Sequence, residues 1–105
     1  MEECKKSPND CGVAKTLKVI GSKWTMMIVH NLFEGNNRFG SLQRALPGIS
    51  PKTLSQRLQE LESEKIITKK VFAEVPLHVE YNLTDKGKSL GGIFDSLAQW
   101  GQNSK

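Results

Sequence analysis

The stretch Phe39–Leu61 constrains the fold of this chain most, because it predicts two short helices joined by a tight Pro47-Gly48 turn. In the second helix, leucines recur at i, i+4 and i+7, the spacing of an apolar stripe that lies on a core. These leucines are Leu54, Leu58 and Leu61. Ser50 is a favourable N-cap residue, and Pro51 suits the first helical position, where a missing N–H costs nothing. The segment therefore predicts a helix-turn-helix with one buried side.

Polar and basic side chains occupy the rest of this second helix, which we expect to run from Pro51 to about Glu64. Side chains of these types reach phosphates and base edges in a major groove, and arginine and glutamine match guanine and adenine with paired hydrogen bonds. We predict DNA contacts, with Lys52 on phosphate, for Ser50, Lys52, Thr53, Gln56 and Arg57. Capping alone would explain Ser50, and an ordinary amphipathic surface helix is the alternative for the segment taken by itself.

Length and composition place the chain among small globular proteins. Its 105 residues, 37% hydrophobic and 25% charged, allow one domain with a modest core. No apolar run approaches the roughly 20 residues of a membrane helix. The first ten residues are polar and lack the apolar region of a secretion signal. We therefore expect a cytoplasmic protein with no membrane partner.

The positive charge is concentrated in the middle of the chain. Lysine and arginine total 15 against 11 acidic residues, a net charge of +4. The basic residues of the central segment are Arg38, Arg44, Lys52, Arg57, Lys65, Lys69 and Lys70. Three glutamates cluster late in the second helix, at Glu60, Glu62 and Glu64. The first half of that helix is therefore basic or neutral, which favours approach to a phosphate backbone.

Helical signals also precede and follow the central segment. Asp10 is a candidate N-cap for a first helix that ends near Gly21, and Ser22 for a second helix from Lys23 to Leu32 or Phe33. A further helix begins after Thr84, a good N-cap, with glycines that lower its intrinsic helicity. Its apolar stripe consists of Leu90, Ile93, Phe94, Leu97 and Trp100. We expect contacts with the core or with a partner to stabilise this last helix.

Between the central segment and the last helix, the hydrophobic period changes to two. Apolar residues alternate with polar ones from Ile67 to Val75 and again from Val79 to Leu83, although Phe72 interrupts the pattern. Pro76-Leu77 separates the two runs and predicts a β-hairpin. Lys69 and Lys70 lie at its start, where we expect them to reach phosphates.

This order of elements is that of a winged helix-turn-helix domain, mainly α with a two-stranded hairpin as the wing (an α+β class). In such domains the second helix of the motif enters the major groove while the hairpin lies over the neighbouring backbone or minor groove. Winged helices also serve as protein–protein modules, so the fold alone leaves an interaction module open. The basic first half of the helix beginning at Pro51 favours double-stranded DNA as the partner.

The sequence resembles the HxlR-type transcriptional regulators, a branch near the MarR-like winged helices. The resemblance spans residues 11–101, which we take as one domain preceded by a flexible segment, residues 1–10. The segments that carry the resemblance are CGVAKTLKVIGSKWTMMIVHNLFEG, NRFGSLQRALPGISPKTLSQRLQELE, EVPLHVEYNLTDKGKSL and LAQWG. The resemblance implies a bacterial homodimer on an operator with two half-sites, joined through its first and last helices. The corresponding interface residues are Val13, Leu17, Ile93, Phe94, Leu97 and Trp100.

The wing departs from the family pattern at one position. Many members carry an arginine just before the Val-Glu-Tyr sequence, where this chain has His78. A neutral histidine donates a hydrogen bond but attracts phosphate weakly near pH 7. His78 is therefore either a weak DNA contact or a solvated surface residue.

Cys11 stands where members of the family usually have a cysteine, which in some of them senses oxidants or electrophiles. A thiol in the first turn of a helix has a lowered pKa, so we keep Cys11 as a candidate redox sensor, with Cys4 as its resolving partner. A packed, inert thiol is the alternative, and a structural disulfide is not expected in the cytosol.

The sequence favours no enzyme. A small thiol enzyme using Cys11 would need a base, and His30 falls on a helix expected to be buried while His78 falls on the wing. The spacing of the two cysteines and two histidines does not suit a metal. We therefore predict no catalytic residue, no metal and no cofactor. The sequence does not indicate an effector.

Overall fold

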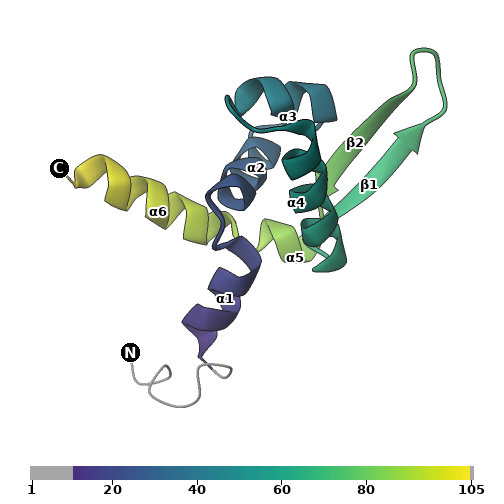
Figure 1. Ribbon diagram of the computed structural model, residues 1–105. Coiled ribbons are helices and arrows are strands. Elements are labelled where there is room, and N and C mark those ends of the chain that lie inside the picture. The colour runs from purple at the N-terminus through teal and green to yellow at the C-terminus, as the bar shows by residue number, and fades with distance from the viewer. Residues whose placement is uncertain (1–10, 105) are drawn as a thin grey trace.

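The computed structural model describes residues 11–104, and within them it contains six helices and a two-stranded antiparallel sheet (Figure 1). The elements are α1 (Gly12–Ile20), α2 (Lys23–Phe33), α3 (Phe39–Ala45), α4 (Pro51–Ser63), β1 (Ile67–Phe72), β2 (His78–Leu83), α5 (Asp85–Lys88) and α6 (Gly91–Asn103). The predicted fold class, mainly helical with a hairpin wing, is confirmed.

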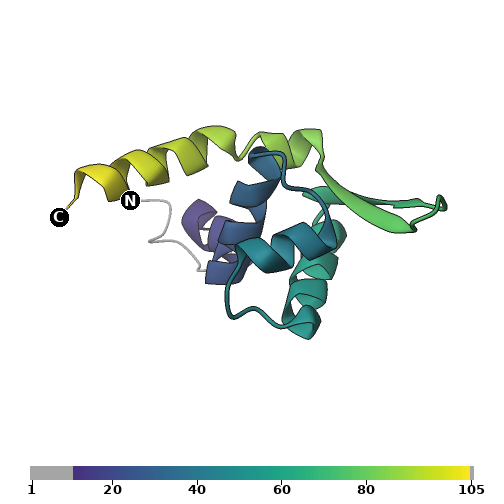
Figure 2. The same ribbon diagram turned by 90° about the horizontal axis from the view of Figure 1, so that it is seen from above.

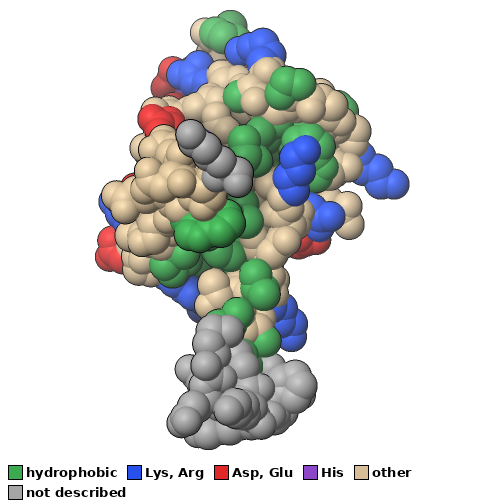
Figure 3. Space-filling view, turned by 90° about the vertical axis from the view of Figure 1, so that its left-hand side faces the viewer, with side chains coloured by type: hydrophobic (Ala, Val, Ile, Leu, Met, Phe, Trp, Pro, Cys, Tyr) green, Lys and Arg blue, Asp and Glu red, His purple; other side chains and the backbone are tan. Residues whose placement is uncertain are grey.

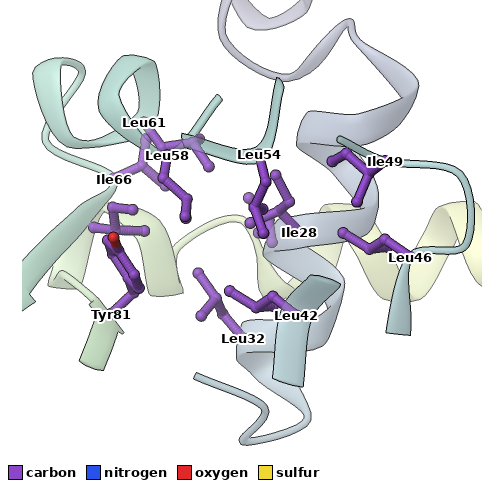
Figure 4. Packing of buried hydrophobic residues seen from close by; sticks show 12 residues of the cluster. Ile28, Leu32, Leu42, Leu46, Ile49, Leu54, Leu58, Leu61, Ile66 and Tyr81 are labelled. Carbon is purple, nitrogen blue, oxygen red and sulfur yellow. The ribbon is translucent and has the colours of Figure 1, made fainter. Parts of the chain in front are cut away.

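Helix α2 is the centre around which the other elements pack, since it contacts α1, α3, α4 and β2. Figure 4 shows Leu54 of α4 against Ile28 of α2, while Leu58 and Leu61 gather near Tyr81 of β2. Burial, and to a smaller extent the charge of a nearby glutamate, raise the pKa of the Tyr81 phenol, which keeps it neutral within the core. The predicted leucine stripe of α4 is therefore buried.

The helix-turn-helix forms as the sequence predicts. Helix α3 ends at Ala45, and Gly48 adopts a positive φ of 93° in the turn, a conformation that glycine reaches without steric cost. The Ser50 hydroxyl accepts a hydrogen bond from the Thr53 N–H at 3.1 Å, and Pro51 is the first residue of α4. The cap fixes where α4 begins and so which side chains face outward.

The hairpin is shorter than the predicted alternation. Strand β1 ends at Phe72, and residues 73–77 form the loop, so Val75 does not belong to a strand. The start of α3 is tied to the hairpin as well: Arg38 forms an isolated bridge with Glu80, and the Tyr81 N–H donates to the Asn37 carbonyl at 2.8 Å. These bonds hold the wing against the helix-turn-helix.

The last helix differs from the prediction of a single helix after Thr84. The chain forms the short helix α5, passes through Ser89 and Leu90, and resumes as α6. The Thr84 hydroxyl caps α5 by accepting from the Gly87 N–H at 3.0 Å, and it donates to the Lys65 carbonyl at 2.6 Å. Two glycines at the start of α6 weaken helix propagation, which is consistent with a break at this point.

The first helix also begins differently, because its N-cap is Cys11 rather than Asp10. Asp10 itself, the predicted flexible segment 1–10 and Cys4 lie outside the described residues. Helix α1 ends at Ile20, which is buried, and Gly21 follows as the predicted C-cap.

Gly87 allows α5 to lie directly on the start of β1. A Cβ atom at this position would collide with the Ile66 carbonyl oxygen, which is a backbone atom, and would touch the Leu83 side chain. We expect Gly87→Ala to lower the free energy of unfolding by about 1–3 kcal/mol, the usual cost of an overpacked site. Urea denaturation of the purified protein measures this change.

Gly92→Ala in α6 is the matched control, since an added Cβ there meets no atom within 4 Å. It should leave stability unchanged or raise it by up to about 1 kcal/mol. Equal stabilities of the two variants would contradict the close packing of α5 on β1.

Candidate nucleic-acid interface

The exposed side of α4 is the centre of the candidate interface. Figure 2 shows α3, α4 and the hairpin on the part of the molecule away from the free end of α6. Lys52 and Gln56 are exposed there, with Gln59 one turn further on the same face. Thr53 and Arg57 lie at its border and are partly buried. The sequence prediction missed Gln59, although its i+7 spacing from Lys52 would have found it.

The Arg57 side chain forms an ion pair with Glu60 of the same helix. Its Nη1 atom lies 3.0 Å from both carboxylate oxygens of Glu60, and the side chain is 30% exposed. Its Nε atom is buried and has no hydrogen-bond partner among the described residues. The guanidinium must therefore leave Glu60 to reach a base edge. Because such a pair near the surface contributes at most about 1 kcal/mol, a stronger acceptor on DNA would displace it.

Ser50 and Thr53 are engaged with each other at the start of α4. The Ser50 hydroxyl accepts the Thr53 N–H and donates to the Thr53 Oγ1 at 3.0 Å. Capping thus accounts for Ser50, whereas the Thr53 hydroxyl keeps its own proton available for a further acceptor.

The two lysines of the wing point to opposite faces of the hairpin. Lys69 pairs with Tyr81 across the sheet, and Lys70 pairs with Glu80, so adjacent positions alternate in direction. Lys70 also places its ammonium 4.9 Å from the centre of the Phe72 ring. Both lysines are exposed, but a single flat surface would meet only one of them at a time.

His78 lies at the start of β2 and is packed rather than solvated. Its ring stacks on Phe72, with centroids 4.6 Å apart and planes 15° apart, and its Nε2 atom is 3.4 Å from Glu80. The side chain is 20% exposed. The side chain is therefore partly buried rather than fully solvated. The stacking on Phe72 also explains why that residue interrupts the alternation of the strand.

A second exposed surface, of apolar character, lies between α1 and α6. Figure 3 looks onto it and shows hydrophobic side chains gathered between the two helices. Leu17 and Trp100 are 55% and 74% exposed, and Val13, Ile93 and Leu97 are also exposed. A groove of about 500 Å³ runs along α1 and α6. We call the surface formed by Val13, Leu17, Ile93, Leu97 and Trp100 the apolar face.

Phe94, a predicted interface residue, is less exposed than the five residues of the apolar face. It is partly buried, packs against the core and contacts Phe33 with ring centroids 6.1 Å apart. Its position explains how α6 is anchored: one side of the helix packs against α2 while the neighbouring side remains exposed.

Cys11 is buried, with 4% exposure, at the N-cap of α1. It is disulfide-bonded, in contrast to the expectation that no structural disulfide forms. Gly12 and Val13, which follow it directly, line the groove between α1 and α6. Changes at the sulfur atom are therefore close to the apolar face.

His30, expected on a buried helix, is in fact exposed and lies 3.9 Å from Glu34 on the next turn. Within residues 11–104, no group of three or more histidine, cysteine or acidic side chains is arranged to hold a metal ion. None of the helices in this part of the chain is both long and apolar enough to cross a membrane.

Comparison with known proteins agrees with this geometry. Residues 19–105 match the HxlR-like helix-turn-helix family. The uncharacterised HTH-type transcriptional regulator YtcD of Bacillus subtilis is 43% identical over 93% of this chain and 78% of its own length. The crystal structure of YtcD has a TM-score of 0.82, with 44% identity, 88% of this chain and 94% of that chain covered.

Solved structures of two redox-related proteins are similar as well. The redox regulator HypR in its oxidised form has a TM-score of 0.84 at 36% identity, covering 90% of this chain and 98% of its own. The reduced form of the transcriptional regulator YodB from B. subtilis has a TM-score of 0.76 at 34% identity, covering 90% of this chain and 93% of its own. The relatives are regulators rather than enzymes, and this chain is accordingly a transcriptional regulator of the HxlR-like helix-turn-helix family.

Proposed function

We propose that this protein regulates transcription in the cytoplasm by binding duplex DNA sequence-specifically, as a homodimer on an operator with two half-sites. The observation that carries the proposal is the orientation of α4. Its leucine stripe is buried, which leaves Lys52 and Gln56 projecting from a firmly held helix. A helix of 13 residues is long enough to lie in a major groove.

The residues of this surface divide by chemistry into two roles. Gln56 has a paired donor and acceptor that suits adenine, and Arg57 has paired donors that suit guanine, with Thr53 beside them. Lys52 meets the phosphate backbone near the start of α4, and Ser50 keeps the helix end in place. On the wing, Lys70 and His78 share one face of the hairpin and contact the neighbouring backbone there, while Lys69 reaches phosphates on the other face. Phosphate contacts of this kind set the register, and base contacts set the sequence.

Selection from a pool of randomised duplexes tests the proposal. The enriched duplex and a scrambled version are then compared in equilibrium binding at two salt concentrations. Selective binding that weakens with salt supports the regulator, because phosphate contacts release counterions. A winged-helix interaction module, the alternative function, would enrich no sequence and would bind both duplexes equally or not at all.

Gln56→Ala should reduce discrimination between the enriched duplex and its variants by about tenfold or more, since a paired contact to adenine contributes about 1–3 kcal/mol. The loss should concentrate at one base pair in each half-site, as measured by competition with singly substituted duplexes. Gln102→Ala, an exposed glutamine of α6, is the matched control and should leave every affinity unchanged. An equal effect of both substitutions would contradict base reading by α4.

The homodimer forms through the apolar face. Five large hydrophobic side chains exposed on α1 and α6 are unusual on a monomer and are typical of a protein interface. A two-fold axis between α1 and α6 makes the surface self-complementary. It also places two copies of α4 on the same duplex about one helical turn, ~34 Å, apart. Because each copy of α4 would read one copy of the sequence, the operator would contain two half-sites, and the one-turn spacing places both on the same face of the DNA.

Leu17→Glu should convert the dimer into a monomer, because a carboxylate would be buried without a partner at the interface. We expect the dissociation constant of the dimer to rise about a hundredfold in sedimentation experiments. Leu77→Glu, which changes an exposed leucine of the hairpin loop, should leave the dimer intact. Dimers of unchanged affinity in Leu17→Glu would contradict the assignment of the apolar face.

Redox control through Cys11 belongs to the same proposal. The sulfur lies at the N-cap of α1, next to residues that line the groove of the apolar face. A change in its bonding therefore acts on the helix that joins the two subunits, and through it on the distance between the two α4 helices. HypR, a similar protein by sequence and structure, is described as a redox regulator.

Cys11→Ser should abolish the response of DNA binding to oxidation. We expect diamide treatment of the previously reduced wild type to change its affinity for the enriched duplex by about tenfold, and dithiothreitol to reverse the change. The variant should bind with one affinity under both conditions. A wild type that is indifferent to diamide, or a variant that still responds, would show that Cys11 is not the sensor.

A further inference from the structure

A cleft between the start of α3 and the hairpin is separate from the exposed side of α4. Its volume is about 400 Å³. Polar side chains from both elements line it, namely Arg38, Ser41, Arg44 and His78. Phe39 and Val79 contribute apolar walls, which lower the local dielectric and strengthen the field of the charges. Only His78 among these residues was a predicted DNA contact.

The cleft is positively charged. The guanidinium groups of Arg38 and Arg44 line it, and no carboxylate is among the residues that form its wall. The Arg44 Nη2 atom donates to the Ser41 hydroxyl at 3.3 Å, which fixes the guanidinium over the first turn of α3. None of the ion pairs found within residues 11–104 involves Arg44. Its charge is therefore not neutralised by a neighbouring acid.

Glu80, which does not itself line the cleft, contacts both Arg38 and His78. One of its oxygens lies 3.7 Å from Arg38 Nη2 and 3.4 Å from His78 Nε2. The backbone bridge between Arg38 and Glu80 fixes the same pair from the main chain. Because Glu80 offsets much of the charge of Arg38, Arg44 is the stronger anion-binding group of the two.

We infer that this cleft seats one phosphate group of the DNA backbone, bound by Arg44 with help from Arg38. Arginine matches a phosphate with two parallel hydrogen bonds, so the site would fix position as well as contribute affinity. The occupant is a duplex because the cleft lies between α3 and the wing, and Figure 1 shows both of these elements beside α4. The inference rests on the proposed function, and it adds a contact that neither α4 nor the wing lysines make.

Arg44→Gln tests the site on the duplex enriched by selection. We expect its affinity to fall about tenfold and the slope of log affinity against log salt to shrink by about 1, the effect of one lost phosphate contact. Selectivity between the enriched and scrambled duplexes should not change, since phosphates carry no sequence information. Arg44→Lys, which keeps the charge, should retain the slope while losing part of the affinity.

Lys88→Gln is the matched control, because it removes one positive charge from an exposed residue of α5 outside the cleft. Thermal unfolding of each variant verifies that the fold is intact. An Arg44→Gln variant that binds like Lys88→Gln would overturn the site while leaving DNA binding by α4 unaffected. A wild type with no selective binding would overturn the proposed function itself, and with it the site.

Methylphosphonate substitution locates the phosphate directly. Replacing one backbone phosphate at a time by the neutral group should weaken wild-type binding at a position outside the bases read by α4. At that position, Arg44→Gln should lose no further affinity, while at all other contacted phosphates it should respond like the wild type. Equal losses in both proteins at every position would overturn the site.

Discussion

The burial of one stripe of α4 is the constraint on which the rest of the structure depends. Leu54, Leu58 and Leu61 are almost completely buried, and each contributes about 1.5–3 kcal/mol to folding. A rotation of the helix about its axis would expose leucine and bury charge, so the helix has one permitted orientation. The direction in which Lys52 and Gln56 project is therefore set by hydrophobic packing on the opposite side.

Local signals that agree with one another explain why the helix-turn-helix could be predicted from the sequence. Ser50, Pro51 and the leucine spacing each mark the same helix, and the structure places its start and end within a residue of the prediction. The same leucine spacing also predicted which side of α4 is exposed. Gln59 was overlooked although that period includes it.

The features that could not be predicted depend on contacts between distant segments. The stacking of His78 on Phe72 needs the exact register of the hairpin, and the pairing of Arg38 with Glu80 needs the wing to lie against α3. The ion pair between Arg57 and Glu60 depends on side-chain conformation, which cannot be read from the periodicity of the sequence. In the last helix, the cap signal lies at Thr84 but the apolar stripe begins only at Leu90, so the pattern contained no information about where the chain breaks between them.

Because of the break between α5 and α6, a change of angle at the break would move α6 as one unit. Its 13 residues span about 20 Å at 1.5 Å per residue, and it meets the rest of the domain through only a short anchored portion around Phe94. A tilt of about 10° at Ser89 and Leu90 would displace the far end by about 3 Å, close to the rise of one base pair. In the proposed homodimer, whose subunits would be joined through this helix, a small angular difference at the break corresponds to a whole base-pair step along the duplex.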